Sequence, residues 1–168
     1  MTQKTHLKPL PPERAALEIE AEIEPDAWAL IQRGFVPRTP QDKWVIFLDD
    51  HNWLHIHRSL TGTCIFLAHF APHPEQDEIY TIDQAWVNRN SDQYKMKDLV
   101  YDAKLFVYLL RRLLLGHNVP FPVPERMPHQ NKPLHEQHVM GQRRKKTASD
   151  DDEPDEPPSS FIPLNLLN

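Results

Sequence analysis

The sequence predicts a small α+β domain in which an antiparallel sheet packs against one long helix. Three observations indicate this fold. The stretch Gln41–Leu115 holds 11 of the 15 aromatic residues but only two of the 17 prolines. Within it, three apolar runs with strand character follow one another and are joined by short turns. An apolar pattern with helical spacing comes after them.

Composition divides the chain into an ordered part and two arms. Hydrophobic residues make up 39% of the chain, against roughly 45–50% in a typical globular protein. The prolines lie mainly at the two ends. We therefore expect a flexible arm at residues 1–12 and a single α+β domain at 13–125. Residues 126–168 are predicted to be a disordered tail, proline-rich and charged, that ends in an apolar segment.

The first part of the domain contains one undecided element and one short helix. Residues 13–24 are rich in helix formers, yet their apolar residues alternate with glutamates at period two, which is typical of a strand. Both interpretations stay open for this stretch. Pro25 and Asp26 then suit the start of a helix and Gly34 suits its end, so a short helix is expected between them.

A three- to four-stranded antiparallel meander follows. We predict strands over Lys43–Asp49, Trp53–Ser59 and Thr63–Phe70, because these runs are apolar or alternate at period two. The turns between them are short and rich in Asp, Asn, Thr and Gly, as hairpin turns are. Glu78–Val87 offers a fourth strand, or a strand that leads into irregular chain.

The long helix is predicted from Gln93 to Leu115. Apolar residues recur there at helical spacing, Ser91 suits the N-cap and Gly116 suits the end. Such a helix would lie across one face of the meander and bury it.

The candidate ligand-binding residues are His57, Arg58, Ser59, Thr61 and Gly62, at the end of the second predicted strand. Arg58 could hold a phosphate or carboxylate, the hydroxyls and the amides around Gly62 could donate to it, and His57 could hydrogen-bond or exchange a proton. Alternation places Arg58 on the face opposite His57 and Ser59, unless a bulge redirects it. The alternative is an ordinary hairpin in which Arg58 pairs with a carboxylate.

The sequence contains no established motif for catalysis, phosphate binding or metal binding. The chain has no glycine-rich phosphate loop, no nucleophile elbow and no paired cysteines. His55 and His57 could share a metal ion, but the sequence marks no further ligand for it. Cys64 lies within a predicted strand, where a buried, inert thiol is expected. The sequence therefore assigns no catalytic residue, no cofactor and no metal.

A stretch of the predicted sheet resembles a known group of proteins. Lys43–Phe70 resembles small bacterial proteins and appended domains with a KW…WLxxHRSxTGxCI pattern, associated with macrodomain and ADP-ribosylation contexts. Leu60 stands where tryptophan is expected, which removes an aromatic ring that could stack on a base. The resemblance implies a phosphorylated or nucleotide-like ligand linked to ADP-ribose metabolism. The residues that carry it are Lys43, Trp44, Leu54, His57, Arg58, Ser59, Thr61, Gly62, Cys64 and Ile65.

The C-terminus supports an alternative function. After an acidic stretch the chain ends in apolar residues that have the composition of a partner-docking segment. The protein would then be a non-enzymatic adaptor or an immunity-type protein. The segment could equally fold back onto its own domain. The docking residues are Phe161, Ile162, Leu164, Leu166 and Leu167.

Charge and hydropathy limit the partners that the protein is expected to bind and the cellular compartment in which it is expected. Residues 28–119 carry ten basic and ten acidic side chains, which disfavours a nucleic-acid partner. No apolar run approaches the roughly 18 residues of a membrane span. The N-terminus lacks the apolar stretch of a secretory signal, and one cysteine forms no internal disulfide. A cytoplasmic protein is expected.

Overall fold

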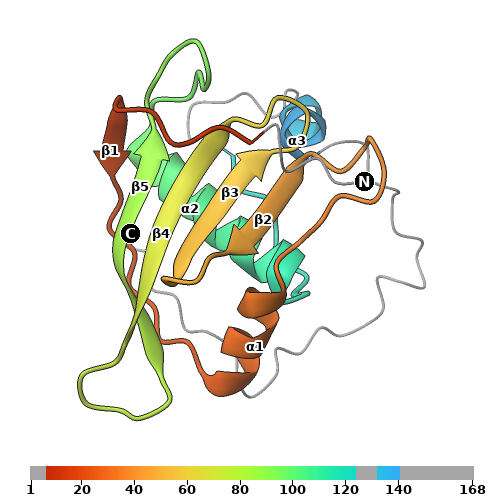
Figure 1. Ribbon diagram of the computed structural model, residues 1–168. Helices are drawn as coiled ribbons and strands as arrows, with labels where there is room; N and C mark the ends of the chain where they lie inside the picture. The colour runs from red at the N-terminus through yellow and green to blue at the C-terminus, as the bar shows by residue number, and fades with distance from the viewer. Residues whose placement is uncertain (1–6, 124–131, 141–168) are drawn as a thin grey trace, which may run out of the picture.

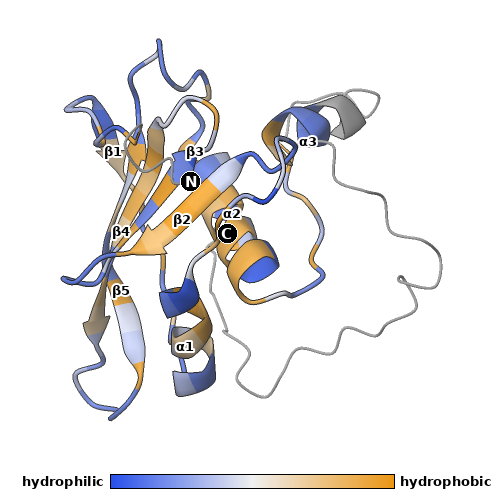
Figure 2. Cartoon of the chain, turned by 45° about the vertical axis from the view of Figure 1, so that its right-hand side comes forward, coloured by the Kyte–Doolittle hydropathy of each residue, from blue (hydrophilic) through white to orange (hydrophobic). Residues whose placement is uncertain are grey.

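The computed structural model describes residues 7–123 and 132–140. Its strands form one antiparallel sheet with the order β1-β5-β4-β3-β2, and helix α2 lies across one face of this sheet (Figure 1). Figure 2 shows hydrophobic residues concentrated in the central strands and in α2. The strands are β1 (Arg14–Ala16), β2 (Trp44–Leu48), β3 (Trp53–Arg58), β4 (Cys64–Pro72) and β5 (Tyr80–Asn88). The helices are α1 (Pro25–Arg33), α2 (Leu99–Leu109), the π-helical turn η2 (Leu110–Leu114) and α3 (Lys132–Met140).

The α+β class and the antiparallel meander are confirmed, but the sheet has five strands rather than three or four. Strands β2 to β5 pair in chain order, as the short turns predict. The fifth strand is β1, which pairs with β5. It comes from the stretch 13–24 that the sequence leaves undecided. The period-two pattern there reflects real alternation, because Leu17, Ile19 and Ile23 are buried while the glutamates between them are exposed.

The register of the sheet separates an inner row of side chains from an outer row. Directly paired residues point to the same face. The inner row, against α2, contains Ile46, Ile56, Phe66 and Val87, each at most 1% exposed. The outer row consists of the residues next to these in each strand, and their side chains are half-buried. Its members are Phe47, His55, Leu67 and Trp86.

Helix α2 supplies the other half of the core. Phe106 is fully buried and meets the ring of Phe66 edge-on, with ring centroids 5.6 Å apart. Leu105 and Leu109, on the same helix, are also buried. Burial of each side chain of this size contributes about 1.5–3 kcal/mol, so the residues that α2 buries against the inner row stabilise the domain.

The expected continuous helix from Gln93 to Leu115 is wrong at both ends. Asp98, rather than Ser91, is the N-cap: its carboxylate accepts hydrogen bonds from the amides of the first turn of α2. Before Asp98 there is a single turn, in which the Asn90 carbonyl accepts the amides of Gln93 and Tyr94, and residues 94–98 are neither helix nor strand. At the other end the hydrogen bonding widens to a π-turn, in which the Leu115 amide reaches the Leu110 carbonyl.

The short helix α1 is confirmed between Pro25 and Arg33. Trp28 stacks on Tyr80 at the end of the sheet, with ring centroids 4.0 Å apart. Gly34 ends the helix with φ +70° and lies against the backbone of Ile46 in β2. Because a Cβ at this position would meet the Ile46 carbonyl, the turn requires glycine.

Both arms that the sequence sets aside contain ordered residues. In the arm 1–12, Leu10 is buried and the Lys8 amide donates to the Gly62 carbonyl at 2.8 Å. In the range 126–168, residues Lys132–Met140 form α3. This helix was not expected, because the segment shows no marked amphipathic pattern. Contacts with the end of the sheet bury its last two residues, Val139 and Met140.

Candidate functional site

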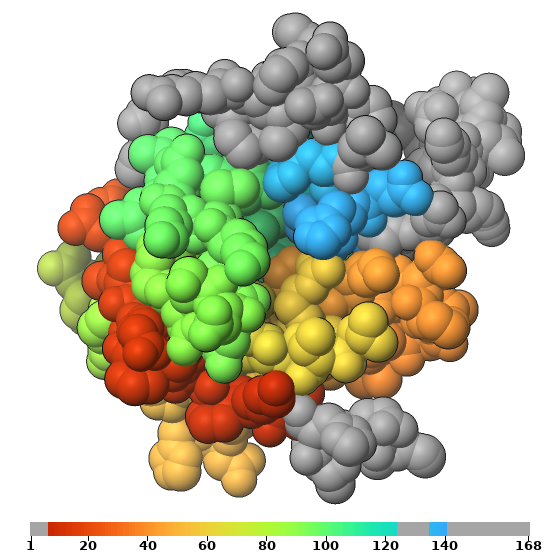
Figure 3. All heavy atoms as spheres, turned by 90° about the horizontal axis from the view of Figure 1, so that it is seen from above, coloured from red at the N-terminus to blue at the C-terminus, as the bar shows by residue number. Residues whose placement is uncertain are grey.

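A cavity of about 350 Å³ lies at one end of the sheet, between the sheet, α2 and α3. Figure 3 shows α3 (blue) above the end of the sheet and beside the green segment that leads into α2. The described residues that line the cavity come from all of these elements. They are Trp44, Arg58, Thr61, Ile65, Gln93, Tyr94, Lys95, Met96, Tyr101, Leu105, His135, His138 and Val139.

Arg58, the last residue of β3, is the best-defined group in this cavity. Its guanidinium carbon lies 4.7 Å from the ring centroid of Trp44, a cation–π contact. Its Nη1 donates to the Val139 carbonyl at 2.8 Å and its Nη2 to the His138 carbonyl at 3.2 Å. Burial lowers the pKa of Arg58, with Tyr94 opposing the shift. An arginine nevertheless stays protonated at neutral pH.

The segment Gln93–Met96 forms another part of the cavity lining, and a buried ion pair holds it in place. Asp102 in the first turn of α2 is fully buried and pairs with Arg89. Its other carboxylate oxygen accepts the Tyr94 hydroxyl at 2.8 Å. Arg89 also donates to the Met96 carbonyl at 3.3 Å. Lys95, exposed at the cavity mouth, is therefore flanked by two anchored neighbours.

Tyr101 and His135 connect α2 to α3 inside the cavity. The Tyr101 hydroxyl lies 2.7 Å from His135 Nε2, at hydrogen-bond distance. Burial, and then the charge of His138, lower the pKa of His135. Burial, and then the charge of Asp102, raise the pKa of Tyr101. The pair is therefore neutral at neutral pH.

The electrostatic character of the cavity is cationic. Its described lining contains two charged residues, Arg58 and Lys95, and none of these lining residues is acidic. The nearest carboxylate in the network, Asp102, is already occupied by Arg89 and Tyr94. A cavity with fixed positive charge and no carboxylate in its described lining favours an anionic group.

Of the five residues predicted as ligand-binding, the structure brings only Arg58 and Thr61 to this cavity. His57 lies on the outer face, where its ring stacks near Phe47. The strand alternation thus separates Arg58 from His57, and the bulge between Ile56 and His57 does not reunite them.

The other two predicted residues serve the turn. The Ser59 hydroxyl donates to the Asp42 carbonyl at 2.7 Å. Gly62 has φ +76° and its carbonyl accepts His57 Nδ1–H at 3.0 Å. Because a carbonyl only accepts, His57 carries its proton on Nδ1. Its Nε2 has no hydrogen-bond partner, and burial lowers the pKa of His57.

The outer face carries a second group of histidines. His55 Nε2 lies 2.9 Å from the Asp49 carboxylate and His69 Nδ1 lies 2.8 Å from Asp83. His55 also stacks on Phe47, with ring centroids 4.5 Å apart. No group of three or more potential ligands in residues 7–123 and 132–140 is arranged to hold a metal ion.

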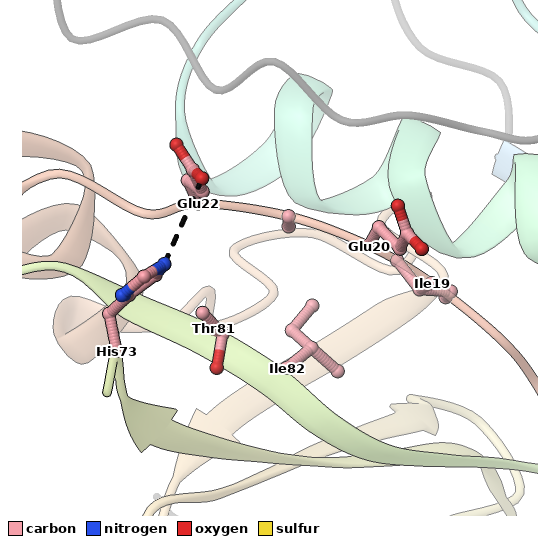
Figure 4. Close-up of a pocket in the computed structure, with 7 residues that line it drawn as sticks. Ile19, Glu20, Glu22, His73, Thr81 and Ile82 are labelled. Atoms are coloured by element: carbon pink, nitrogen blue, oxygen red, sulfur yellow. Dashed lines mark ion pairs between the residues drawn. The ribbon is translucent and has the colours of Figure 1, made fainter. Parts of the chain in front are cut away.

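A second cavity, of about 390 Å³, lies between residues 19–22 and β5. Figure 4 shows Glu20 and Glu22 on one side and His73, Thr81 and Ile82 on the other. His73 Nε2 is 4.0 Å from the Glu22 carboxylate. Glu20 and Glu22 are exposed, so this hollow has the character of a solvated acidic surface rather than of a built site.

No family model, curated protein or solved structure matches the chain. In the part of the chain that the structure describes, no helix is both long and apolar enough to traverse a bilayer. The docking residues expected at the C-terminus, Phe161 to Leu167, lie outside the described residues.

Sequence reasoning missed most of the cavity lining. Lys95 was placed inside the expected long helix, and His135 inside the expected disordered tail. One sequence signal pointed to α3: Pro133 is followed by LHEQHVM, and proline is common in the first turn of a helix. The contact between α3 and Arg58 has no signal in the sequence.

Proposed function

We propose that the protein binds a small anionic ligand, carrying a phosphate group, in the cationic cavity beside Arg58. The observation that supports this function is the charge of the lining: Arg58 and Lys95 face one cavity whose described lining contains no carboxylate. A volume of about 350 Å³ is at the small end of the range for ligand sites, roughly 300–1,000 Å³.

Arg58 is the main anion-binding group in this proposal. A guanidinium has five N–H donors, and hydrogen bonds to two carbonyls of α3 leave further donors for a phosphate. Stacking on Trp44 fixes the plane of the guanidinium, so little side-chain freedom is lost on binding. Lys95 adds a second positive charge at the exposed mouth.

ADP-ribose is the first ligand to test. The resemblance of Lys43–Phe70 to proteins from ADP-ribosylation contexts suggests it, and its two phosphates suit Arg58 and Lys95. The aromatic rings of Trp44 and Tyr101 in the same lining are compatible with a nucleotide-like ligand. The cavity accommodates the phosphate-bearing part of such a ligand, and the remainder would extend past Lys95.

Titration calorimetry with ADP-ribose and with inorganic phosphate tests the proposal. Arg58→Gln should weaken binding about 10- to 100-fold, because one charge-assisted hydrogen bond contributes about 1.5–3 kcal/mol. Lys95→Gln should weaken it by a smaller factor, since Lys95 is exposed. The matched control is Lys97→Gln, the same change two residues away at an exposed position that does not line the cavity.

Two results would contradict the function. The first is absence of binding by the wild-type protein to either compound. The second is equal loss of affinity in Lys95→Gln and Lys97→Gln together with an unchanged affinity in Arg58→Gln, which would indicate nonspecific attraction. If the protein binds inorganic phosphate but not ADP-ribose, the proposed anion site is supported and ADP-ribose is excluded as its ligand.

A further inference from the structure

Helix α3 contacts the cavity through its last carbonyl groups. The Val139 carbonyl accepts two donors, Arg58 Nη1 at 2.8 Å and Trp44 Nε1 at 3.0 Å. The His138 carbonyl accepts Arg58 Nη2 at 3.2 Å. The last carbonyls of a helix carry the negative end of its dipole. Arg58 therefore already has a partial negative charge in front of it when α3 is docked.

An anion at Arg58 and the carbonyls of α3 are in conflict. Both require guanidinium N–H groups, and a phosphate beside the Val139 carbonyl would bring two negative groups together. Arg58 has further N–H groups, but an anion that bonds the same two terminal nitrogens lies against the α3 carbonyls and competes with them. Each therefore weakens the binding of the other.

Among the described side chains of α3, residues 135–140, the remaining contacts involve His135, Val139 and Met140. They comprise the hydrogen bond between Tyr101 and His135, the ring contact of His135 with Phe121, and the burial of Val139 and Met140. The side chains of Glu136, Gln137 and His138 are exposed. Together with the carbonyl contacts to Arg58 and Trp44, these interactions hold α3 against the end of the sheet.

We propose that α3 is a displaceable cover of the cationic cavity, whose C-terminal carbonyls compete with the anionic ligand for Arg58. This inference rests on the proposed function. It predicts negative coupling: bound anion releases α3, and docked α3 lowers the apparent affinity for the anion. By reciprocity, the factor by which docked α3 weakens anion binding equals the factor by which bound anion weakens the docking of α3.

The test compares two full-length variants at one exposed position of α3. Gln137→Pro removes an interior helix hydrogen bond and clashes with the preceding turn, whereas Gln137→Ala preserves the helix. Gln137 does not line the cavity. Titrated with inorganic phosphate, Gln137→Pro should bind more tightly than the wild type, and Gln137→Ala should bind like the wild type.

Hydrogen exchange gives the expected size of the effect. The protection factor of the α3 amides in the wild-type protein reports the ratio of docked to undocked molecules. The gain in phosphate affinity of Gln137→Pro should not exceed that factor. Saturating phosphate should also accelerate exchange of the α3 amides in the wild type, a measurement that requires no variant.

The outcomes separate this inference from the function on which it rests. Equal or weaker phosphate binding by Gln137→Pro, or α3 exchange that slows with phosphate, refutes the cover and leaves the anion site intact. Absence of phosphate binding in the wild type and in Gln137→Pro alike refutes the proposed function, and the inference with it.

Discussion

Arg58 and Val139 are 81 positions apart in the sequence, yet the guanidinium of one donates a 2.8 Å hydrogen bond to the carbonyl of the other. This contact joins the end of the interior strand β3 to the last turn of α3. Arg58 lines the cavity and also contacts the helix that forms one of its walls. If Arg58 binds an anion as proposed, ligand binding and the position of α3 are coupled through this side chain.

The buried ion pair below the cavity should be costly to break. Asp102→Asn leaves Arg89 without its carboxylate, and removal of one partner of a buried pair typically costs about 3–5 kcal/mol. We expect a loss of this size in the free energy of unfolding, measured by urea denaturation. The control is Asp98→Asn, the same change one helical turn earlier, where asparagine caps as well as aspartate. Similar small losses in both variants would show that the pair is not structural.

The stability of the domain should depend on the protonation of His57. Burial lowers its pKa in the folded state, below the ordinary 6.5, so the unfolded chain binds the proton more tightly. Its contribution to stability is complete above about pH 6.5 and is lost as the pH falls below that value. The loss approaches about 1.4 kcal/mol per pH unit between the two pKa values.

Urea titrations from pH 5 to pH 8 measure this effect. The variant His57→Phe should show a weaker fall in stability at low pH than the wild type, because the buried titrating group is gone. His51→Phe, at an exposed turn position, serves as the control and should retain the wild-type slope. Parallel pH profiles for the wild type and His57→Phe would exclude the effect.

Gly34→Ala should destabilise the junction between α1 and β2. The backbone there has φ +70°, and the added Cβ would meet the Ile46 carbonyl. We expect a loss of more than about 1 kcal/mol in unfolding free energy, seen as a lower midpoint of thermal unfolding. Gly116→Ala is the comparison: Gly116 also has positive φ, +74°, but nothing lies within 4 Å of its Cβ position. The proposed clash predicts a larger loss of unfolding free energy at Gly34 than at Gly116. Equal losses would show that the positive φ alone, without a clash, causes the destabilisation.

The thiol of Cys64 should be inert in the folded protein. It is 1% exposed, and burial raises its pKa to about 12, so almost none of it is thiolate at neutral pH. Alkylation by iodoacetamide at pH 8 should be slow in buffer and rapid in concentrated urea, as followed by mass spectrometry. Comparable rates in the two solvents would mean that the strand opens readily.

The sheet could be predicted because its signals are local. Each strand from β2 to β5 carries its own apolar pattern, and the turns between them carry Asp, Asn and Gly. The long helix was predicted too generously, since apolar spacing alone cannot register the capping carboxylate of Asp98. The register of β1 with β5 depends on pairing between distant residues, so residues 13–24 stayed ambiguous.

The site was less predictable than the fold for the same reason. Arg58 stood out through its neighbours in the sequence, but its partners come from α3 and from the segment Gln93–Met96. Lys95 reaches the cavity only because Arg89 and Asp102 pair beneath it. Such contacts join residues that are far apart in the sequence and follow no periodic spacing, so a local sequence pattern cannot predict them.

The pairing of β1 with β5 also has a consequence for the order of folding. Ala15 lies opposite Val87, whereas the other three pairings, β2 with β3, β3 with β4 and β4 with β5, join strands that are neighbours along the chain. Closing a long loop costs more entropy than closing a hairpin, and distant contacts form slowly. During synthesis the N-terminal segment emerges first, but it must wait for the last strand before it can join the sheet. Until β1 has joined, the outer edge of β5 is unpaired.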